Sequence, residues 1–181
     1  MKNKGFTLIE ILITVAIFSI TIGAMSGLFS SVLRNQRRGL SNQELVDSAS
    51  YNLEYISRIL RMARKQTADL PSCLSQSGLN YEMNAAQDSI KFLNYQGNCY
   101  TIYLQESIIY QKKNQENPLA LTPAKLKVSF LKFNLSGQSD TDNLQPRATL
   151  AFIIENITNK TEEKTELKVQ TSISQRELDT K

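Results

Sequence analysis

An apolar run at residues 6–33 constrains the fold of this 181-residue chain more than any other feature. Its only charged residue is Glu10, and residues 11–33 carry no charge. As a helix that rises about 1.5 Å per residue, this uncharged stretch would be roughly 35 Å long, and the hydrocarbon core of a bilayer is about 30 Å thick. The residues that follow are far more polar, beginning with Arg34, Arg37 and Arg38. The sequence therefore predicts one membrane-inserted helix that carries a separate domain.

Composition argues against most kinds of enzyme. The chain contains no histidine, which excludes His-based triads, Cys-His dyads and His-ligated metal sites. Its two cysteines are too few for a four-thiolate zinc site. No nucleophile–base pair, phosphate-binding loop or close pair of carboxylates occurs at a recognisable spacing. We therefore expect a protein without enzymatic activity and without a cofactor or metal.

Two ordinary interpretations of the N-terminal run each leave a feature unexplained. A secretory signal peptide would fit Lys2, Lys4 and a small-x-small site at 24–26, but the apolar run continues well past that site. A plain single-pass anchor would explain the hydropathy but not Glu10, because an acid in a spanning helix is costly and by default indicates function. Basic residues flank the run on both sides, so charge alone does not determine its orientation.

A third interpretation comes from residues 4–10, which read KGFTLIE and lead directly into the apolar run. They resemble the class III signal of type IV pilins and pseudopilins. The resemblance implies that a prepilin peptidase cuts between Gly5 and Phe6 and N-methylates Phe6, so that residues 1–5 are a leader peptide. It also implies that Glu10 serves in filament assembly. The expected location is then the bacterial inner membrane, single-pass, with the leader in the cytoplasm and the C-terminal domain in the periplasm or outside.

The same resemblance implies the partners: the prepilin peptidase, other minor and major pilins or pseudopilins, and an inner-membrane assembly platform. A carboxylate in an apolar region needs either a proton or a cation beside it. Cleavage before Phe6 creates such a cation, the α-amine of an adjacent subunit. Alternatively, Glu10 completes a capping box with Thr7 at the start of the helix. We favour assembly because a helix cap has no need to lie in lipid.

The helix is expected to continue beyond the membrane. Apolar residues recur at steps of three and four, which predicts one buried helix face made of Leu45, Ala49, Leu53, Ile56, Leu60 and Ala63. We therefore assign 6–33 to a transmembrane and filament-core helix, 34–69 to its amphipathic continuation and 70–181 to the following domain. A capping-box match at 41–44, preceded by Gly39, predicts a weak point or a restart of the helix near 39–41.

Arg58, Arg61 and Lys65 line up at i, i+3 and i+7 and would form a basic stripe on that helix. Such a stripe could serve DNA capture by a competence pilus. The alternative, an ordinary solvated helix face, is the preferred interpretation. No aromatic residues interleave with the stripe to stack on bases, so we expect no nucleic-acid partner.

From about residue 88 the apolar pattern changes from helical to alternating, which predicts strands at 88–95, 99–105, 107–113, 125–135, 147–155 and 165–174. The Gly97-Asn98 pair suits a tight hairpin between the first two. Within 125–135 the apolar phase shifts by one residue after Phe130, which indicates a bulge or a strand buried on both faces. The expected fold class is α+β, a pilin-like arrangement of one long N-terminal helix packed on an antiparallel sheet.

A second resemblance lies in the strands. The segments at 121–123, 127–128, 131–133 and 170–176 are similar to those of J-class minor pseudopilins of type II secretion and W-class minor type IV pilins. Those subunits sit in tip or initiation complexes. The first proline is Pro71, whereas many major pilins have one within the embedded helix, which also favours a minor subunit. The resemblance implies a subunit that initiates or caps a filament; the alternative is a membrane-tethered binding tip, either an adhesin or a DNA-capturing module.

The remaining candidate residues are two cysteines and one acidic loop. Cys73 and Cys99 form a disulfide if the domain is extracytoplasmic, and two buried free thiols are the alternative. Residues 140–143 read DTDN and offer oxygen ligands for calcium. They lack the downstream acid of a calcium loop, so a solvated connection between strands is the preferred interpretation.

Overall fold

A computed structural model describes residues 5–138, 144–157 and 164–177 of the chain. The contacts divide the chain into two compact units, Met1–Ser41 and Asn42–Lys181. Helix α1 (Leu8–Arg61) has 54 residues and contributes to both units. It is helical through residues 39–41, so the expected restart there is wrong. A glycine inside a helix costs only about 1 kcal/mol relative to alanine, and Gly39 does not interrupt α1.

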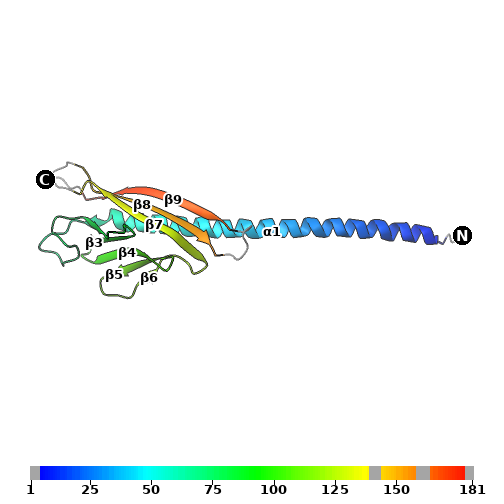
Figure 1. Cartoon of the computed structure of the whole chain (residues 1–181), viewed down its shortest axis with the longest axis horizontal. Coiled ribbons are helices and arrows are strands. Elements are labelled where there is room, and N and C mark those ends of the chain that lie inside the picture. The colour runs from blue at the N-terminus through cyan, green and yellow to red at the C-terminus, as the bar shows by residue number, and fades with distance from the viewer. Residues whose placement is uncertain (1–4, 139–143, 158–163, 178–181) are drawn as a thin grey trace. The chain divides into compact units, whose positions relative to one another are not determined.

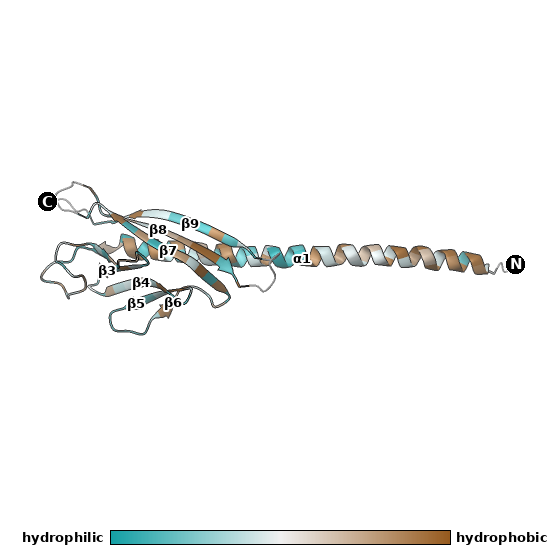
Figure 2. Cartoon of the chain, viewed as in Figure 1, coloured by the Kyte–Doolittle hydropathy of each residue, from teal (hydrophilic) through white to brown (hydrophobic). Residues whose placement is uncertain are grey.

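Hydropathy changes along α1 as the sequence predicts (Figure 2). Its first part is almost uniformly apolar, and its later part alternates between polar and apolar residues. Within the second unit, the helix buries Leu45, Ala49, Ile56 and Leu60 in the core, with Leu53 partly buried beside them. The predicted apolar face is therefore confirmed for the helical residues. Ala63 is buried as well, but it belongs to a strand.

The first six strands of the chain, β1 to β6, form one sheet, sheet A. Its spatial order is β1 (Ala63–Arg64), β3 (Ser89–Asn94), β4 (Cys99–Gln105), β5 (Ile108–Lys113) and β6 (Leu119–Ala120), with β2 (Tyr81–Met83) also paired to β3. All described pairings in it are antiparallel. The predicted strands at 88–95, 99–105 and 107–113 are confirmed, and the three shortest strands were not predicted.

Three longer strands form sheet B, in which each strand pairs antiparallel with the next along the chain, and Figure 1 shows them as three long arrows side by side. They are β7 (Leu126–Ser136), β8 (Arg147–Asn156) and β9 (Glu166–Ser174). These agree with the predicted strands at 125–135, 147–155 and 165–174. The α+β prediction is confirmed, although the strands divide between two sheets. Both sheets and the helix contribute side chains to one hydrophobic core.

Two tight turns of sheet A hold one edge of β7. The Val128 N–H donates to the Ser107 carbonyl at 2.7 Å, and the Phe133 N–H donates to the Gln87 carbonyl at 2.8 Å. Ser107 and Gln87 both have positive φ, 64° and 60°, which costs a residue with a side chain about 1–2 kcal/mol. These bonds pair backbone groups of β7 that would otherwise be left open at the edge of sheet B. The strained turns therefore connect the two sheets.

The end of α1 is determined by residues far along the chain. The Tyr81 hydroxyl donates to the Leu60 carbonyl at 2.8 Å, and the Arg176 N–H donates to the Arg61 carbonyl at 2.9 Å. The last carbonyls of a helix have no partners within it, so these bonds satisfy them. Burial raises the pKa of Tyr81 far above its ordinary value, which keeps the hydroxyl protonated as a donor. The helix stops at Arg61 rather than at the predicted residue 69, because the next residues pair as β1 with β3.

The register of β7 against β8 shifts between Val128 and Phe130, which is the predicted bulge. Because the bulge adds one residue to β7, side chains after it change face. Phe133 then lies in the core, 1% exposed, whereas Phe130 is 40% exposed on the opposite face. A strand without the bulge would reverse these positions.

We predict that Phe133→Ala lowers the free energy of unfolding by about 3–5 kcal/mol, because it leaves a cavity in the core. Phe130→Ala is the matched control in the same strand and should cost less than about 1 kcal/mol. Urea titration of the full chain in detergent measures both. A larger loss at Phe130 than at Phe133 would contradict the bulged register.

Candidate functional site

The N-terminal residues Gly5, Phe6 and Thr7 precede the helix and are exposed. The Thr7 carbonyl accepts hydrogen bonds from the N–H groups of Glu10 at 3.1 Å and Ile11 at 3.3 Å, which makes Thr7 the N-cap residue. Phe6 is 79% exposed. The Gly5–Phe6 peptide bond therefore lies outside the helix, in the kind of accessible backbone that a peptidase can bind.

Glu10 lies in the first turn of α1 and is exposed. Among the described residues, neither its carboxylate nor the Thr7 hydroxyl has a hydrogen-bond or ion-pair partner. The side-chain bonds of a capping box are thus not formed here. An acid at this position of an apolar helix has to find its partner in another molecule when the helix is surrounded by lipid.

The apolar part of α1 is long and hydrophobic enough to cross a membrane, by length and composition. Several of its hydroxyl side chains are paired within the helix: Thr14 donates to the Ile11 carbonyl, and Ser19 donates to the Val15 carbonyl, each at 2.8 Å. Thr21 and Ser26 bond the preceding turn in the same way. A hydroxyl bonded to a carbonyl one turn earlier carries no unpaired donor into hydrocarbon. Glu10, by contrast, is an ionisable group without such a bond.

In the second unit, a disulfide joins Cys73 and Cys99, whose Cα atoms are 5.4 Å apart. Cys99 begins β4, and Cys73 lies in the connection between β1 and β2. Leu74 and Leu93 are buried beside Cys73 in a small second hydrophobic cluster. The disulfide therefore attaches the long connection between β1 and β2 to strand β4 of sheet A.

Gln66 organises the same connection through its buried side chain. Its Oε1 accepts from the N–H groups of Cys73 at 3.1 Å and Leu74 at 3.3 Å. Its Nε2 donates to the carbonyls of Thr67 and Pro71, both at 3.1 Å. Sequence reasoning missed this residue, since a lone glutamine after a helix carries no recognisable pattern.

A buried carboxylate lies on sheet B. Glu155 accepts from the ammonium groups of Lys164 at 2.9 Å and Lys127 at 3.1 Å. Hydrogen bonds from Lys164 and then Lys127 lower the pKa of Glu155, so it is ionised at neutral pH. Lys127 lies in β7 and Glu155 in β8, and this group of charges therefore supports the sheet rather than forming a reactive site.

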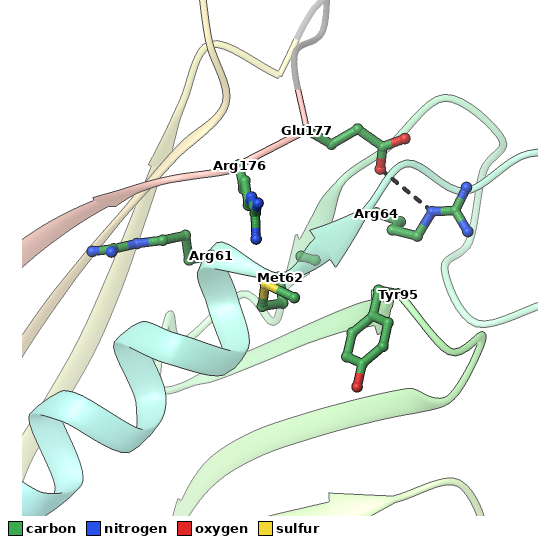
Figure 3. A pocket seen from close by; sticks show the side chains of 7 residues that line it. Arg61, Met62, Arg64, Tyr95, Arg176 and Glu177 are labelled. Atoms are coloured by element: carbon green, nitrogen blue, oxygen red, sulfur yellow. Dashed lines mark ion pairs between the residues drawn. The ribbon is translucent and has the colours of Figure 1, made fainter.

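A cleft of about 380 Å³ lies at the end of the helix (Figure 3). We call it the arginine cleft, and its lining residues are Arg61, Met62, Ala63, Arg64, Tyr95, Arg176 and Glu177. They come from the end of α1, from β1, from the turn after β3 and from the segment after β9. Sequence reasoning did not bring them together, because only the folded sheets place these segments side by side.

The predicted basic stripe of Arg58, Arg61 and Lys65 is wrong. Since α1 ends at Arg61, Lys65 follows β1 and does not share a helix face with the two arginines. Arg58 also forms an ion pair with Glu54 one turn earlier. The three residues therefore do not form a continuous basic row on the helix.

Two segments considered as candidates from the sequence fall outside the described residues: the acidic loop at 140–143 and leader residues 1–4. Within the described part of the chain, no group of three His, Cys, Asp or Glu side chains is arranged to hold a metal ion.

Residues 1–26 match a family model described as the prokaryotic N-terminal methylation motif. No curated protein and no solved structure matches the chain. The match supports a type IV pilin-like prepilin signal and implies processing by a prepilin peptidase and assembly with other pilins. Together with the long apolar helix, it fits a pilin anchored in the inner membrane.

We predict that the double variant Cys73→Ala/Cys99→Ala loses about 3–4 kcal/mol of unfolding free energy, because the disulfide closes a loop over a separation of 26 residues. Urea titration of the full chain in detergent measures the loss. Wild-type protein treated with reductant is the control and should lose a similar amount. Equal unfolding midpoints for the variant and the oxidised wild type would contradict a stabilising disulfide.

Proposed function

We propose that this chain is a minor subunit of the type IV pilin family, a non-enzymatic protein that helps initiate or cap a pilus-like filament. One observation carries the proposal. An exposed acid, Glu10, which has no partner among the described residues, lies in the first turn of a bilayer-length apolar helix, a few residues after the Gly5–Phe6 bond of a prepilin-type signal. No role within the described part of this chain explains that placement, whereas assembly with other subunits does.

Maturation supplies the group that Glu10 lacks. Cleavage after Gly5 would leave Phe6 as the first residue, with an α-amine at the end of the apolar helix. A carboxylate and an amine from two adjacent subunits neutralise each other, and the pairing is strong where water is scarce. N-methylation retains the positive charge of that amine. The apolar helices of neighbouring subunits would cover the side chains that are exposed in the single chain.

The domain after the helix supports an extracytoplasmic location. A disulfide persists in an oxidising compartment such as the periplasm, and this domain carries one between Cys73 and Cys99. That location agrees with a leader retained in the cytoplasm and a C-terminal domain outside.

The minor class is favoured by two features of the chain. The embedded helix has no proline, and the strand segments are similar to those of J-class pseudopilins and W-class minor pilins. A J-class subunit would serve type II secretion, and a W-class subunit would serve a type IV pilus. Both assignments give the domain the same task, which is contact with other subunits at the start or tip of the filament.

We predict that Glu10→Ala leaves cleavage and methylation of the N-terminus intact and reduces recovery in filaments at least about tenfold, the loss expected for one charge-assisted pair. The measurement is the amount of the chain that co-purifies with the major subunit after shear or crosslinking.

Glu54→Ala is the matched control, since Glu54 lies on the same helix beyond the apolar part and is exposed. It should assemble as the wild type does. Wild-type recovery of Glu10→Ala would overturn the assembly role of Glu10.

A further inference from the structure

We propose that the arginine cleft binds an acidic peptide segment of another protein, with a carboxylate of that segment paired to Arg176. The identity of the partner as another subunit of the same filament rests on the proposed function. Binding of a carboxylate by the cleft does not depend on it.

The shape of the cleft suits a short stretch of peptide. Figure 3 shows Arg176 beside the helix end above Met62, with Arg64 and Glu177 across the opening and Tyr95 along one wall. Ala63 is buried, Met62 is half-buried, and Tyr95 is 54% exposed, so an apolar floor and an aromatic wall lie below the charges. A volume of about 380 Å³ accommodates a few side chains.

Charge selects the ligand. Arg64 pairs with Glu177 at 3.4 Å, and among the described residues the Arg176 guanidinium has no carboxylate partner. Two arginines, Arg64 and Arg176, lie at the opening with one glutamate and leave it with a positive excess, whereas the Arg61 side chain points away (Figure 3). A guanidinium presents two parallel N–H groups to a carboxylate, a geometry that favours Asp or Glu side chains or a chain terminus.

The side chain of Glu177 pairs with Arg64 as a carboxylate of the peptide would. Its bond to Arg64 shows that a carboxylate can lie in this opening. Both side chains are about half exposed, 43% for Arg64 and 50% for Glu177, and an ion pair so open to water contributes little to stability. An incoming carboxylate can therefore displace Glu177 from Arg64 while it pairs with Arg176.

A peptide fits these features better than a nucleic acid does. Duplex DNA needs basic groups spread along its backbone, and this cleft is small and contains a carboxylate of its own. Single strands need several aromatic rings on which bases stack, and Tyr95 is the one aromatic residue among the described side chains that line the cleft.

The test is fluorescence anisotropy on the full chain in detergent micelles. The probes are a fluorescein-labelled peptide that alternates glutamate with leucine, the same peptide with glutamine in place of glutamate, and a short labelled DNA duplex. We expect the glutamate peptide to bind, the glutamine peptide to bind at least about tenfold more weakly, and the duplex not to compete.

Two variants should change affinity in opposite directions. Arg176→Ala should weaken binding of the glutamate peptide about tenfold, because it removes the unpaired guanidinium but keeps the backbone bond to Arg61. Glu177→Gln should strengthen it, because it frees Arg64 and removes a repulsive charge. The exposed pair Lys168–Glu166 on β9 provides matched controls. Lys168→Ala and Glu166→Gln make the same charge changes outside the cleft and should leave affinity unchanged.

A photo-crosslinker in place of Tyr95 tests the partner in cells that assemble the filament. We expect an adduct with another filament subunit through an Asp- or Glu-containing segment, lost in Arg176→Ala and retained in Lys168→Ala. Equal binding of the glutamate and glutamine peptides, tighter binding of the duplex, or no effect of Arg176→Ala would overturn the proposal. The two proposals can fail separately. If Glu10→Ala assembles normally while the wild-type chain still binds the glutamate peptide, the assembly role of Glu10 is overturned and the peptide site stands.

Discussion

An acid on an apolar helix, without a partner among the residues that the structure describes, is the constraint on which the rest of this molecule depends. Every hydroxyl bond described in the first half of α1 returns to the preceding turn, so the helix brings these polar groups into hydrocarbon already paired. Glu10 does not follow that rule. A single chain in a bilayer therefore exposes an acidic side chain and a long apolar surface, and the proposed association with neighbouring helices would cover both.

The C-terminal end of the same helix is bonded to distant parts of the domain. Tyr81 and Arg176 bond the carbonyls of Leu60 and Arg61, and both sheets share one core with the helix. The disulfide and Gln66 attach the connection before β2 to this framework. The arginine cleft lies at this end of the helix, and the backbone bond between Arg176 and Arg61 connects two of its lining segments.

The features that were predictable from the sequence are those with local causes. The prepilin-type signal occupies consecutive residues, the buried helix face follows a period of three and four, and the bulge in β7 shows as a phase shift after Phe130. The features that were missed depend on distant partners. The two-residue strand β1 exists because it pairs with β3, and α1 stops at Arg61 because that pairing begins. The cleft unites residues more than a hundred positions apart, such as Arg61 and Arg176, which no local pattern connects.

N-terminal mass spectrometry of the chain purified from its native membranes tests the central claim most directly. We predict a mature protein that begins at Phe6 with one added methyl group on its amine, and the uncut chain in cells that lack the prepilin peptidase. A chain that keeps residues 1–5 in the presence of the peptidase would contradict it. In that case the cation proposed to pair with Glu10 would not exist.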